Sequence, residues 1–367
     1  MNTKSPKLNI ALLFGGRSGE HEISLMSARS VLDALDPEKY EILQIGITHE
    51  GAWLSGENTL EAFEKGDFDK LSPVILPPDP SQKGIYGIRN TQYERLSTFD
   101  VVFPVMHGSY SEDGTMQGLL EMADVAYVGA GVVGSAVGMD KGIFKDVMRA
   151  NGIPVTEGVL VLRSEIENEM PAVIEKAAPL GFPLFVKPAN MGSSVGVSKC
   201  DNRSSLSEGL LEAAQYDRRI LIERGINARE IEIAVLGNEK PRASVPGEVL
   251  PSREFYSYES KYIDGTSGLL IPAPLDEKTS AAMRNIAIQT YQAIDCAGMA
   301  RVDFLLDKDD GKFYLNEVNT LPGFTEISMY PKLWEASGLP YPQLVDRLIE
   351  LALERKKDKD RIKRRFD

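Results

Sequence analysis

The sequence contains few of the residues that build zinc sites and disulfide frameworks. Its 367 residues include only two cysteines, Cys200 and Cys296, and three histidines. Together these residues match no recognised zinc-binding spacing, and two cysteines do not make a disulfide framework. The composition therefore supports neither a structural zinc ion nor a fold held together by disulfides.

Long apolar segments and an excess of basic residues are also absent. No apolar run approaches the roughly 20 residues that a membrane-spanning helix needs, and the first residues lack the basic, apolar and small-residue order of a secretion signal. We therefore expect a cytoplasmic protein that does not bind membranes. The formal net charge of −13 argues against a nucleic-acid backbone as the main partner, so small molecules are the expected ligands.

The chain is long enough for more than one domain. Its 367 residues, with 43% hydrophobic and 26% charged residues, are typical of a globular protein with two or three domains and a cleft between them. We predict an N-terminal domain over residues 1–130, a central domain over residues 131–224 and a C-terminal domain over residues 225–367.

The first part of the chain is typical of a β-α-β unit. An apolar run over residues 8–14 ends in two glycines, helical periodicity follows over residues 20–35, and a second apolar run covers residues 40–47. A buried strand over residues 100–106 and a helix over residues 115–123 extend this pattern. The pattern predicts a parallel sheet that binds ligands at the carboxyl ends of its strands.

The rest of the chain is predicted to form mixed α+β modules. After a glycine-rich boundary and a helix over residues 140–151, strands and helices alternate up to a strand over residues 220–223. Beyond it we expect strands over residues 230–236 and 242–249 and a helix over residues 277–295. The basic stretch near the C-terminus is expected to continue the last helix as a solvated end, since helix C-termini favour cations. An interaction tail is the alternative.

The most informative stretch is residues 301–319, which are predicted to form a β-hairpin. Both arms carry apolar, aromatic and β-branched residues, and an Asp-Asp-Gly segment suits a three-residue turn whose glycine has positive φ. This turn predicts a register in which Asp303 faces Glu317. In the same register Arg301 faces Asn319, and all four side chains share one face of the hairpin.

Facing carboxylates on this hairpin predict a metal site. Carboxylates about 5 Å apart at their Cβ atoms repel one another unless a cation lies between them. Oxygen ligands without Cys or His favour Mg²⁺ or Mn²⁺. The alternative is a solvated hairpin in which the two acids face each other by chance.

A glycine-rich segment over residues 190–197 is a candidate phosphate-binding turn. It follows an apolar run that ends at Lys187, and its N–H groups, with the hydroxyls of Ser193 and Ser194, are donors suited to an anion. It lacks the pattern of a Walker P-loop, and an ordinary Gly-Ser hairpin is the alternative. Lys141, at the start of a predicted helix, is either a second phosphate ligand or a surface lysine.

Two acids near the strand over residues 220–223 are candidate nucleoside ligands. Backbone groups of this strand suit an adenine whose amino group donates to Glu223, while Glu230 faces either a ribose or only solvent. Lys261 and Tyr262 lie in an irregular polar loop, which is either a mobile lid or an ordinary surface loop.

The segment that leaves the hairpin is predicted to offer backbone donors to an anion. A Pro-Gly pair that includes Gly323 forces a turn, and Ser328 is a suitable N-cap for the helix that follows. Free N–H groups at this helix start would lie beside the predicted metal and favour a carboxylate ligand.

Short motifs also occur in a fixed order along almost the whole chain. They are Gly15-Gly16, Glu20-His21-Glu22-Ile23-Ser24-Leu25, His107-Gly108, Glu112-Asp113-Gly114-Thr115, Met139-Asp140-Lys141, Lys187-Pro188, Gly192-Ser193-Ser194-Val195-Gly196, Glu259-Ser260-Lys261-Tyr262, Arg301-Val302-Asp303, Asn316-Glu317-Val318-Asn319-Thr320 and Pro322-Gly323-Phe324-Thr325. In order and number they resemble the ATP-grasp superfamily and, within it, the D-alanine:D-alanine ligases.

This resemblance implies an ATP-grasp fold of α/β and α+β type with three domains. The N-terminal parallel-sheet domain would bind substrate, and the nucleotide would lie between the central and C-terminal domains. ATP is then a substrate, two Mg²⁺ ions, with Mn²⁺ as a substitute, bridge its phosphates to the protein, and a homodimer is expected. The metal ligands implied by the resemblance are Asp303, Glu317 and Asn319.

The resemblance also implies which residues hold ATP. Lysines would contact the phosphates, and the strand that ends near Glu223 would hold the adenine, with Glu230 at the ribose. The full set implied to bind ATP is Lys141, Lys187, Glu223, Arg224, Ile226, Glu230, Lys261 and Asn316.

For the amino-acid substrates, the resemblance implies two neighbouring subsites. Glu22 would anchor the ammonium of the first D-alanine with His107 nearby, and a hydrogen-bonded group around it would include Ser193 and Tyr262. The other implied residues are Arg301 and the Gly323 N–H, which would stabilise an oxyanion, and Ser328 and the Met329 N–H, which would bind the carboxylate of the second substrate.

The implied activity is ATP-dependent ligation of two D-alanines through a D-alanyl phosphate, for peptidoglycan precursor synthesis. Relatives that make the D-alanine:D-lactate ester tend to lack the tyrosine that stands here as Tyr262, so the dipeptide is the expected product. The alternatives are a D-alanine:D-lactate ligase, another ATP-grasp carboxylate-amine ligase, or a nucleotide-binding protein without catalytic activity.

Overall fold

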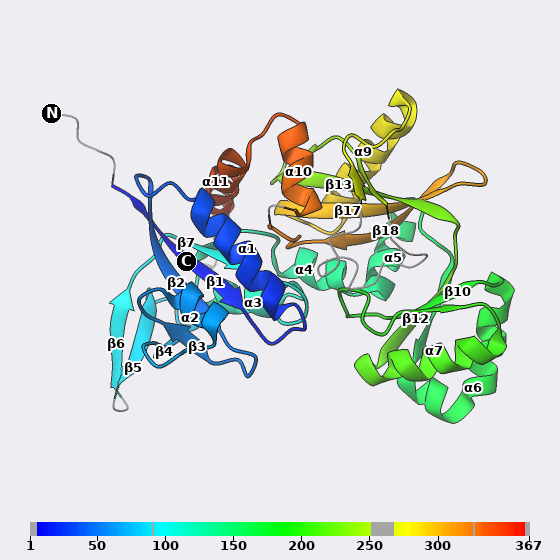
Figure 1. Cartoon of the computed structure of the whole chain (residues 1–367), viewed down its shortest axis with the longest axis horizontal. Coiled ribbons are helices and arrows are strands. Elements are labelled where there is room, and N and C mark those ends of the chain that lie inside the picture. Colours follow the sequence, from blue (N-terminus) through cyan, green and yellow to red (C-terminus); the bar gives the residue numbers. More distant parts are fainter. Residues whose placement is uncertain (1–5, 90–91, 251–267, 326, 364–367) are drawn as a thin grey trace.

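Three β-sheets with packed helices make up the part of the chain that the computed structural model describes, which is residues 6–89, 92–250, 268–325 and 327–363 (Figure 1). The N-terminal sheet has eight strands and the central sheet has four. The C-terminal sheet has six, of which β14 pairs only with β13. No helix within these described ranges is long and apolar enough to cross a membrane.

The N-terminal sheet is parallel in its centre and antiparallel along one edge. β1 pairs in parallel with both β2 and β7, which confirms the predicted β-α-β opening, and residues 10–14 are almost fully buried, as expected for a central parallel strand. Its strands and helices are β1 (Leu8–Gly15), α1 (His21–Ala34), β2 (Tyr40–Ile47), β3 (Trp53–Ser55), α2 (Thr59–Lys65), β4 (Ser72–Ile75), β5 (Ile85–Arg89), β6 (Gln92–Ser97), β7 (Val101–Val105), α3 (Thr115–Met122) and β8 (Ala126–Tyr127).

The central sheet is antiparallel and is covered by two helices that share its core. Apolar residues of α6 and α7 pack against one face, and α6 is kinked at Glu169, two residues before Pro171, as expected near a proline. The elements are β9 (Gly158–Leu162), α6 (Arg163–Ala177), η1 (Ala178–Leu180), β10 (Leu184–Pro188), β11 (Ser198–Cys200), α7 (Arg203–Tyr216) and β12 (Arg219–Arg224).

The C-terminal sheet is also antiparallel, with β13 and β17 at its centre. The single strand predicted over residues 242–249 is wrong: two short strands occur there, because Pro246 lacks an N–H group and interrupts the ladder. The elements are β13 (Ala228–Gly237), β14 (Arg242–Ala243), β15 (Gly247–Leu250), β16 (Gly268–Leu270), α9 (Glu277–Ala293), β17 (Gly298–Asp307), β18 (Phe313–Asn319), α10 (Met329–Ala336) and α11 (Tyr341–Lys359).

The hairpin of β17 and β18 has the predicted register at the end away from its turn, but the turn itself differs from the prediction. Asp303 pairs with Glu317 and Gly311 has φ +70°, as predicted, but a four-residue loop over residues 308–311 replaces the three-residue turn. The longer loop shifts the register by one residue, and a β-bulge at Asn316 shifts it back. The two irregularities cancel, so the predicted pairing of acids is confirmed.

Helices between and after the sheets tie them together. The segment before β9 contributes α4 (Val132–Met139) and α5 (Lys141–Ala150), and Phe144 and Met148 of α5 lie in the same core as the C-terminal sheet. The last helix, α11, packs on β7 and β8 of the N-terminal sheet. The predicted domain boundaries stay predictions, because α5 and α11 pack against sheets that lie on the other side of those boundaries.

The basic stretch near the C-terminus continues the last helix as far as Lys359, where α11 ends, and part of it is bound. Lys357 and Arg361 are exposed, as expected for a solvated helix end. Arg355 donates to the carbonyl groups of Tyr127 and Gly129, and its guanidinium lies 4.2 Å from the centre of the Tyr127 ring. Lys356 and Lys359 pair with acids of the N-terminal domain, so this stretch fastens α11 to that domain.

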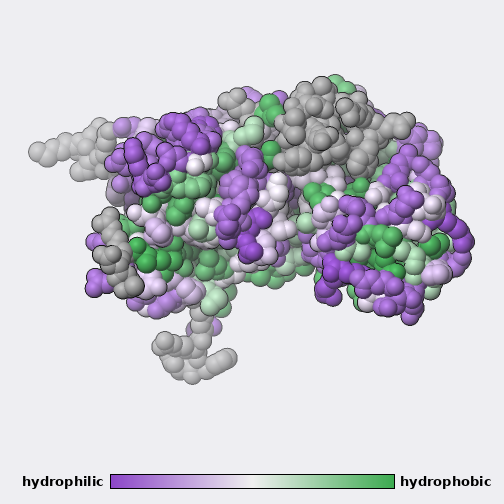
Figure 2. All heavy atoms as spheres, turned by 60° about the horizontal axis from the view of Figure 1, so that its bottom comes forward, coloured by the Kyte–Doolittle hydropathy of each residue, from purple (hydrophilic) through white to green (hydrophobic). Residues whose placement is uncertain are grey.

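Polar and apolar residues both occupy sizeable areas on the face of the molecule that Figure 2 shows. Figure 2 shows apolar residues on this face as separate areas with polar side chains between them. Scattered apolar residues of this kind are normal on a globular protein and mark no interaction surface by themselves.

Candidate active site

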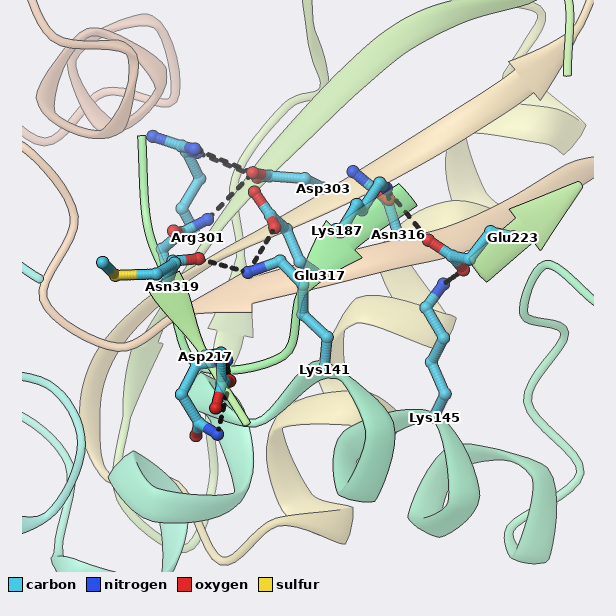
Figure 3. Close-up of polar contacts among 12 residues, drawn as sticks. Lys141, Lys145, Lys187, Asp217, Glu223, Arg301, Asp303, Asn316, Glu317 and Asn319 are labelled. Carbon is cyan, nitrogen blue, oxygen red and sulfur yellow. Dashed lines mark hydrogen bonds and ion pairs between the residues drawn. The ribbon is translucent and has the colours of Figure 1, made fainter. Parts of the chain in front are cut away.

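Many polar side chains line a cleft of about 660 Å³ where the three sheets meet. Loops after β1 and β7 form one wall, and the glycine-rich turn and β12 form a second. The third wall is the β17-β18 hairpin, which carries the labelled Arg301, Asp303 and Glu317 in Figure 3. The predicted site residues that line it are His107, Lys141, Lys187, Ser193, Glu223, Arg224, Ile226, Glu230, Arg301, Asp303, Asn316, Glu317, Asn319 and Gly323.

The two facing carboxylates of the hairpin are each neutralised by a neighbouring cation. The guanidinium of Arg301 donates to both oxygens of Asp303 at 2.8 and 2.7 Å, and the amide of Asn319 donates to the same carboxylate at 2.9 Å. Glu317 lies 3.6 Å from the ammonium of Lys141. Protein groups therefore relieve the repulsion from which a metal was predicted.

The donor set on this hairpin still fits a hard divalent cation. Within the described ranges no group of three or more His, Cys, Asp and Glu side chains could hold a metal by itself. Two carboxylates and the Asn319 carboxamide are all oxygen ligands, and Mg²⁺ is commonly held by one or two carboxylates together with phosphates of the substrate. The residues present therefore suit a cation shared with a phosphate ligand.

The carboxylate of Glu223 is buried between two lysines. Its Oε2 lies 2.9 Å from Lys187 and its Oε1 lies 2.5 Å from Lys145, and only 2% of Glu223 is exposed. Burial by itself would raise the pKa of Glu223, but the two ammonium groups and the hydroxyl of Thr156 hold it well below its ordinary value. Glu223 is therefore an ionised, acceptor-only group at the edge of the cleft.

The glycine-rich turn lies between β10 and β11, as predicted, and is anchored by a lysine. Ser193 and Ser194 have φ of +51° and +59°, which is uncommon for residues other than glycine. The ammonium of Lys141 donates to the Met191 carbonyl at 2.7 Å. Lys141 is thus a cleft residue that supports the turn, and the surface-lysine alternative is wrong.

The position of Glu22 does not fit its predicted role. Its side chain is 65% exposed and lies 3.3 Å from Nε2 of His49, outside the cleft. Glu20, the N-cap residue of α1, lines the cleft instead and accepts a hydrogen bond from the hydroxyl of Ser193. Residues two apart on a helix point about 200° apart, so only one of the two acids can face the cleft. Glu20 directly follows the loop at the carboxyl end of β1, and this position was the signal that favoured it.

His107 braces the loop that leaves the hairpin. Its Nδ1–H donates to the carbonyl of Leu321 at 3.0 Å, and the hydroxyl of Ser27 donates to Nε2 at 3.0 Å. Burial lowers the pKa of His107 despite the nearby Glu20, which agrees with a neutral ring. His107 therefore lines the cleft with both ring nitrogens already bonded.

Glu112 is a cleft residue that belongs to one of the sequence motifs but was not predicted as a site residue. Its carboxyl group accepts from the N–H of Gly108 at 2.8 Å and from the N–H of Leu321 at 3.3 Å. Burial raises the pKa of Glu112 to about 8, and the neighbouring Glu20 adds to this shift. Glu112 thus joins the loop after β7 to the loop after β18 as a largely neutral group.

The residues expected to bind a second carboxylate lie just behind the cleft wall. Ser328 is the residue before α10, as predicted, but its hydroxyl accepts from the N–H of Thr325 at 3.0 Å instead of capping the helix. A Cβ atom placed on Gly323 would lie 3.0 Å from the Ser328 hydroxyl, so these two residues adjoin. Met329 is the buried first residue of α10, where a helix leaves its N–H without an intrahelical acceptor. Lys261 and Tyr262 lie outside the described residues.

Comparison with known proteins identifies relatives of the whole chain. A family model described as D-ala D-ala ligase N-terminus matches residues 9–130, and one described as D-ala D-ala ligase C-terminus matches residues 147–350. A D-alanine--D-alanine ligase from Thermoanaerobacter sp. (strain X514) is 52% identical over 357 residues, which cover 97% of this chain and 99% of the relative. One from Heliobacterium modesticaldum is 50% identical over 356 residues, which cover 97% of both proteins.

Solved structures are similar over the same extent. The D-alanine-D-alanine ligase from Coxiella burnetii has a TM-score of 0.81 and 37% identity, with 97% of each chain covered. VanG D-Ala:D-Ser ligase from Enterococcus faecalis has a TM-score of 0.85 and 34% identity, with 95% of this chain and 100% of that chain covered.

Glu112 is expected to make the stability of the protein depend on pH. The pKa of Glu112 is raised to about 8 in the folded protein, whereas a glutamate in the unfolded chain has its ordinary pKa of 4.5. Between these two pH values the folded protein keeps a proton on Glu112 that the unfolded chain has lost. The stabilisation is complete below the lower value and is lost as the pH rises through the higher one. We expect Glu112→Gln to flatten the fall in Tm between about pH 5 and about pH 9 by several degrees, measured by calorimetry without ligands. Parallel curves for the two proteins would contradict the assignment.

Proposed function

The chain belongs to the D-alanine--D-alanine ligase family, and from this premise we propose how its cleft joins two D-alanine molecules at the expense of ATP. The protein is an ATP-dependent ligase of the ATP-grasp type that forms D-alanyl-D-alanine through a D-alanyl phosphate. The observation that carries the site proposal is the meeting, in one cleft, of an acidic hairpin, lysines of α5 and β10, and an acid of the N-terminal domain.

The edge of β12 is proposed to bind the adenine of ATP. Glu223 is ionised and can only accept hydrogen bonds, which suits the amino group of adenine. Backbone groups of Arg224 and Ile226 would hold the other ring edge, with Glu230 of β13 at the ribose. Pro183 and Phe185 add apolar surface to this part of the cleft, which suits a flat base.

The hairpin and the lysines are proposed to hold the phosphates. Lys141 and Lys187 supply positive charge next to the hairpin: the ammonium of Lys141 lies 3.6 Å from Glu317, and that of Lys187 donates to Oδ1 of Asn316 at 3.4 Å. Asp303, Glu317 and Asn319 would hold Mg²⁺, or Mn²⁺ in its place. When bound, the metal would neutralise charge on the phosphates. Lys261 is proposed as a further phosphate ligand by the family resemblance.

The wall formed by the N-terminal domain is proposed to bind the first D-alanine. Glu20, with the hydroxyl of Ser193, would receive its ammonium group, in place of Glu22. Arg301 is held by Asp303 and by Glu232 at 3.0 Å, so its charge has a fixed position. Arg301 and the N–H of Gly323 are proposed to stabilise the oxyanion that forms when the acyl phosphate is attacked.

The start of α10 is proposed to bind the second D-alanine. The hydroxyl of Ser328 and the N–H of Met329 would receive its carboxylate, since helix N-termini favour anions. Its amine would then face the carbonyl carbon of the first substrate. Tyr262 stays a predicted part of the lid that excludes water from the acyl phosphate.

The chemistry follows from these positions. A carboxylate is a poor electrophile, so the first D-alanine carboxylate attacks the γ-phosphate of ATP and forms an acyl phosphate with release of ADP. The amine of the second D-alanine attacks this acyl carbon, and phosphate leaves. Lysines that face the phosphates stabilise the first step, and Arg301 with the Gly323 N–H stabilises the second. We further propose that the enzyme works in the cytoplasm, where ATP is made, and as a homodimer.

The proposed function is tested by the substrates and product of the reaction. Phosphate release from ATP is measured with Mg²⁺ and either D-alanine, L-alanine, or D-alanine with D-lactate, and the product is identified by its mass. We expect release with D-alanine and formation of the dipeptide, with no ester. Ester as the main product would favour the D-alanine:D-lactate alternative. Absence of D-alanine-dependent release from protein that binds ATP would favour another carboxylate-amine ligase.

Substitution of the two neighbouring acids separates their roles. Glu20→Gln removes the charge that we assign to the ammonium, so the KM for D-alanine should rise about 10- to 100-fold, which is typical for one hydrogen bond to a charged group. Glu22→Gln, on the exposed side of the same helix turn, should change this KM less than about twofold. Steady-state kinetics at saturating ATP measures both, and the reverse order of effects would restore Glu22.

The metal assignment is tested on the hairpin itself. Glu317→Gln should weaken binding of Mn²⁺ in the presence of ADP and lower Mg²⁺-dependent turnover at least about 10-fold, because it removes one charged ligand of the cation. The matched control is Asp310→Asn at the exposed tip of the same hairpin, which should bind Mn²⁺ normally. Normal metal binding and turnover in Glu317→Gln would rule out this ligand.

A further inference from the structure

A fully buried lysine stands behind the edge of the cleft without lining it. Lys145 of α5 is 1% exposed, and its neighbours on the buried face of the helix, Phe144 and Met148, are core residues. Its ammonium lies 2.5 Å from Oε1 of Glu223 and donates to the Thr156 hydroxyl at 2.7 Å. Figure 3 shows Lys145 reaching from its helix to one side of the Glu223 carboxylate, with Lys187 on the other side.

The burial of this lysine is costly unless its partners compensate for it. Removing an ammonium from water costs several kcal/mol, and an apolar side chain of similar length would fill the same space without that cost. The polar contacts of the Lys145 ammonium lead to Glu223 directly and through Thr156. The direct contacts of Lys145 therefore run to the Glu223 carboxylate and to Thr156, and both of these residues line the cleft.

The two carboxylate oxygens of Glu223 have different partners. Oε1 is occupied by Lys145 and by the hydroxyl of Thr156, which accepts from Lys145 and donates to Glu223. Oε2 is paired with Lys187, a residue of the cleft wall. The remaining acceptor capacity of the carboxylate is thus on the Oε2 side, toward the cleft.

We propose that Lys145, together with Thr156, is a positioning residue that makes the cleft prefer a purine with a 6-amino group over one with a 6-oxo group. The inference rests on the proposed function, in which adenine lies at the edge of β12. An ionised carboxylate accepts from an amino group but repels a carbonyl oxygen at the same place. A neutral or rotated Glu223 could donate to that carbonyl, so losing Lys145 would weaken the discrimination.

The test compares ATP with inosine triphosphate, which has a 6-oxo group. Binding of each nucleotide to the full-length protein is measured by calorimetry without D-alanine, and kcat and KM are measured with it. Lys145→Met should lower the preference for ATP about 10- to 100-fold, mainly through the nucleotide Kd and KM, and change the D-alanine KM less than about twofold. Equal loss of affinity for both nucleotides would overturn the proposal, since a merely structural tether predicts that result.

Further variants keep the test decisive if Lys145→Met does not fold. Thr156→Val removes only the hydroxyl that bridges the two charges and should lower the preference in the same direction but less. In a double-mutant cycle, Lys145→Met should have no further effect on the preference when Glu223→Gln is already present. An independent effect in that background would overturn the proposed route through Glu223. Lys176→Met, at a lysine of α6 that is 48% exposed, is the control and should leave the preference unchanged.

The outcome for this inference is separate from that for the ligase activity. If the wild-type protein forms no dipeptide but prefers ATP, and Lys145→Met removes the preference, the inference stands while the proposed function fails. If the wild-type protein forms the dipeptide but binds both nucleotides equally, the inference fails while the ligase activity stands.

Discussion

Carboxylates that are buried or half-buried set the main constraint on this cleft, because an unpaired charge with little access to water is costly. Glu223 on β12 is paired with lysines of α5 and β10, and Glu317 on β18 faces Lys141 of α5. These pairs connect the central sheet, the C-terminal sheet and the helix between them. The ion pairs that balance the charge in the cleft therefore also hold the two sheets in position relative to each other.

The wall on the N-terminal side is built differently, from neutral hydrogen-bonding groups. His107 and Glu112 both bind the backbone of Leu321, and the pKa shift of each favours its uncharged form. Neutral groups can be buried together with less penalty than charges. The loop after β18 is therefore fixed without adding negative charge next to Glu20.

Much of the fold and the acidic hairpin could be predicted from the sequence because both depend on local backbone geometry. A strand turns its side chains with a period of two, so acids on facing arms meet once the register is known. The predicted turn was one residue too short, yet the pairing of Asp303 with Glu317 is confirmed because the bulge at Asn316 compensates. Leu315 and Val318 are both buried although they are three residues apart, and this spacing was the available signal for a bulge.

The sequence by itself determined the order of strands and helices, the glycine-rich turn, the facing acids and the resemblance to a family of ligases. Tertiary structure alone decided that Glu20 and not Glu22 faces the cleft, that Lys145 is buried behind Glu223, and that Glu112 is largely neutral. Arg355 and Lys356 in the basic end of α11 are bound for the same kind of reason, since their partners lie in the N-terminal domain. Such outcomes depend on how a helix is rotated and on charges contributed by distant segments, and residue spacing along the chain carries neither.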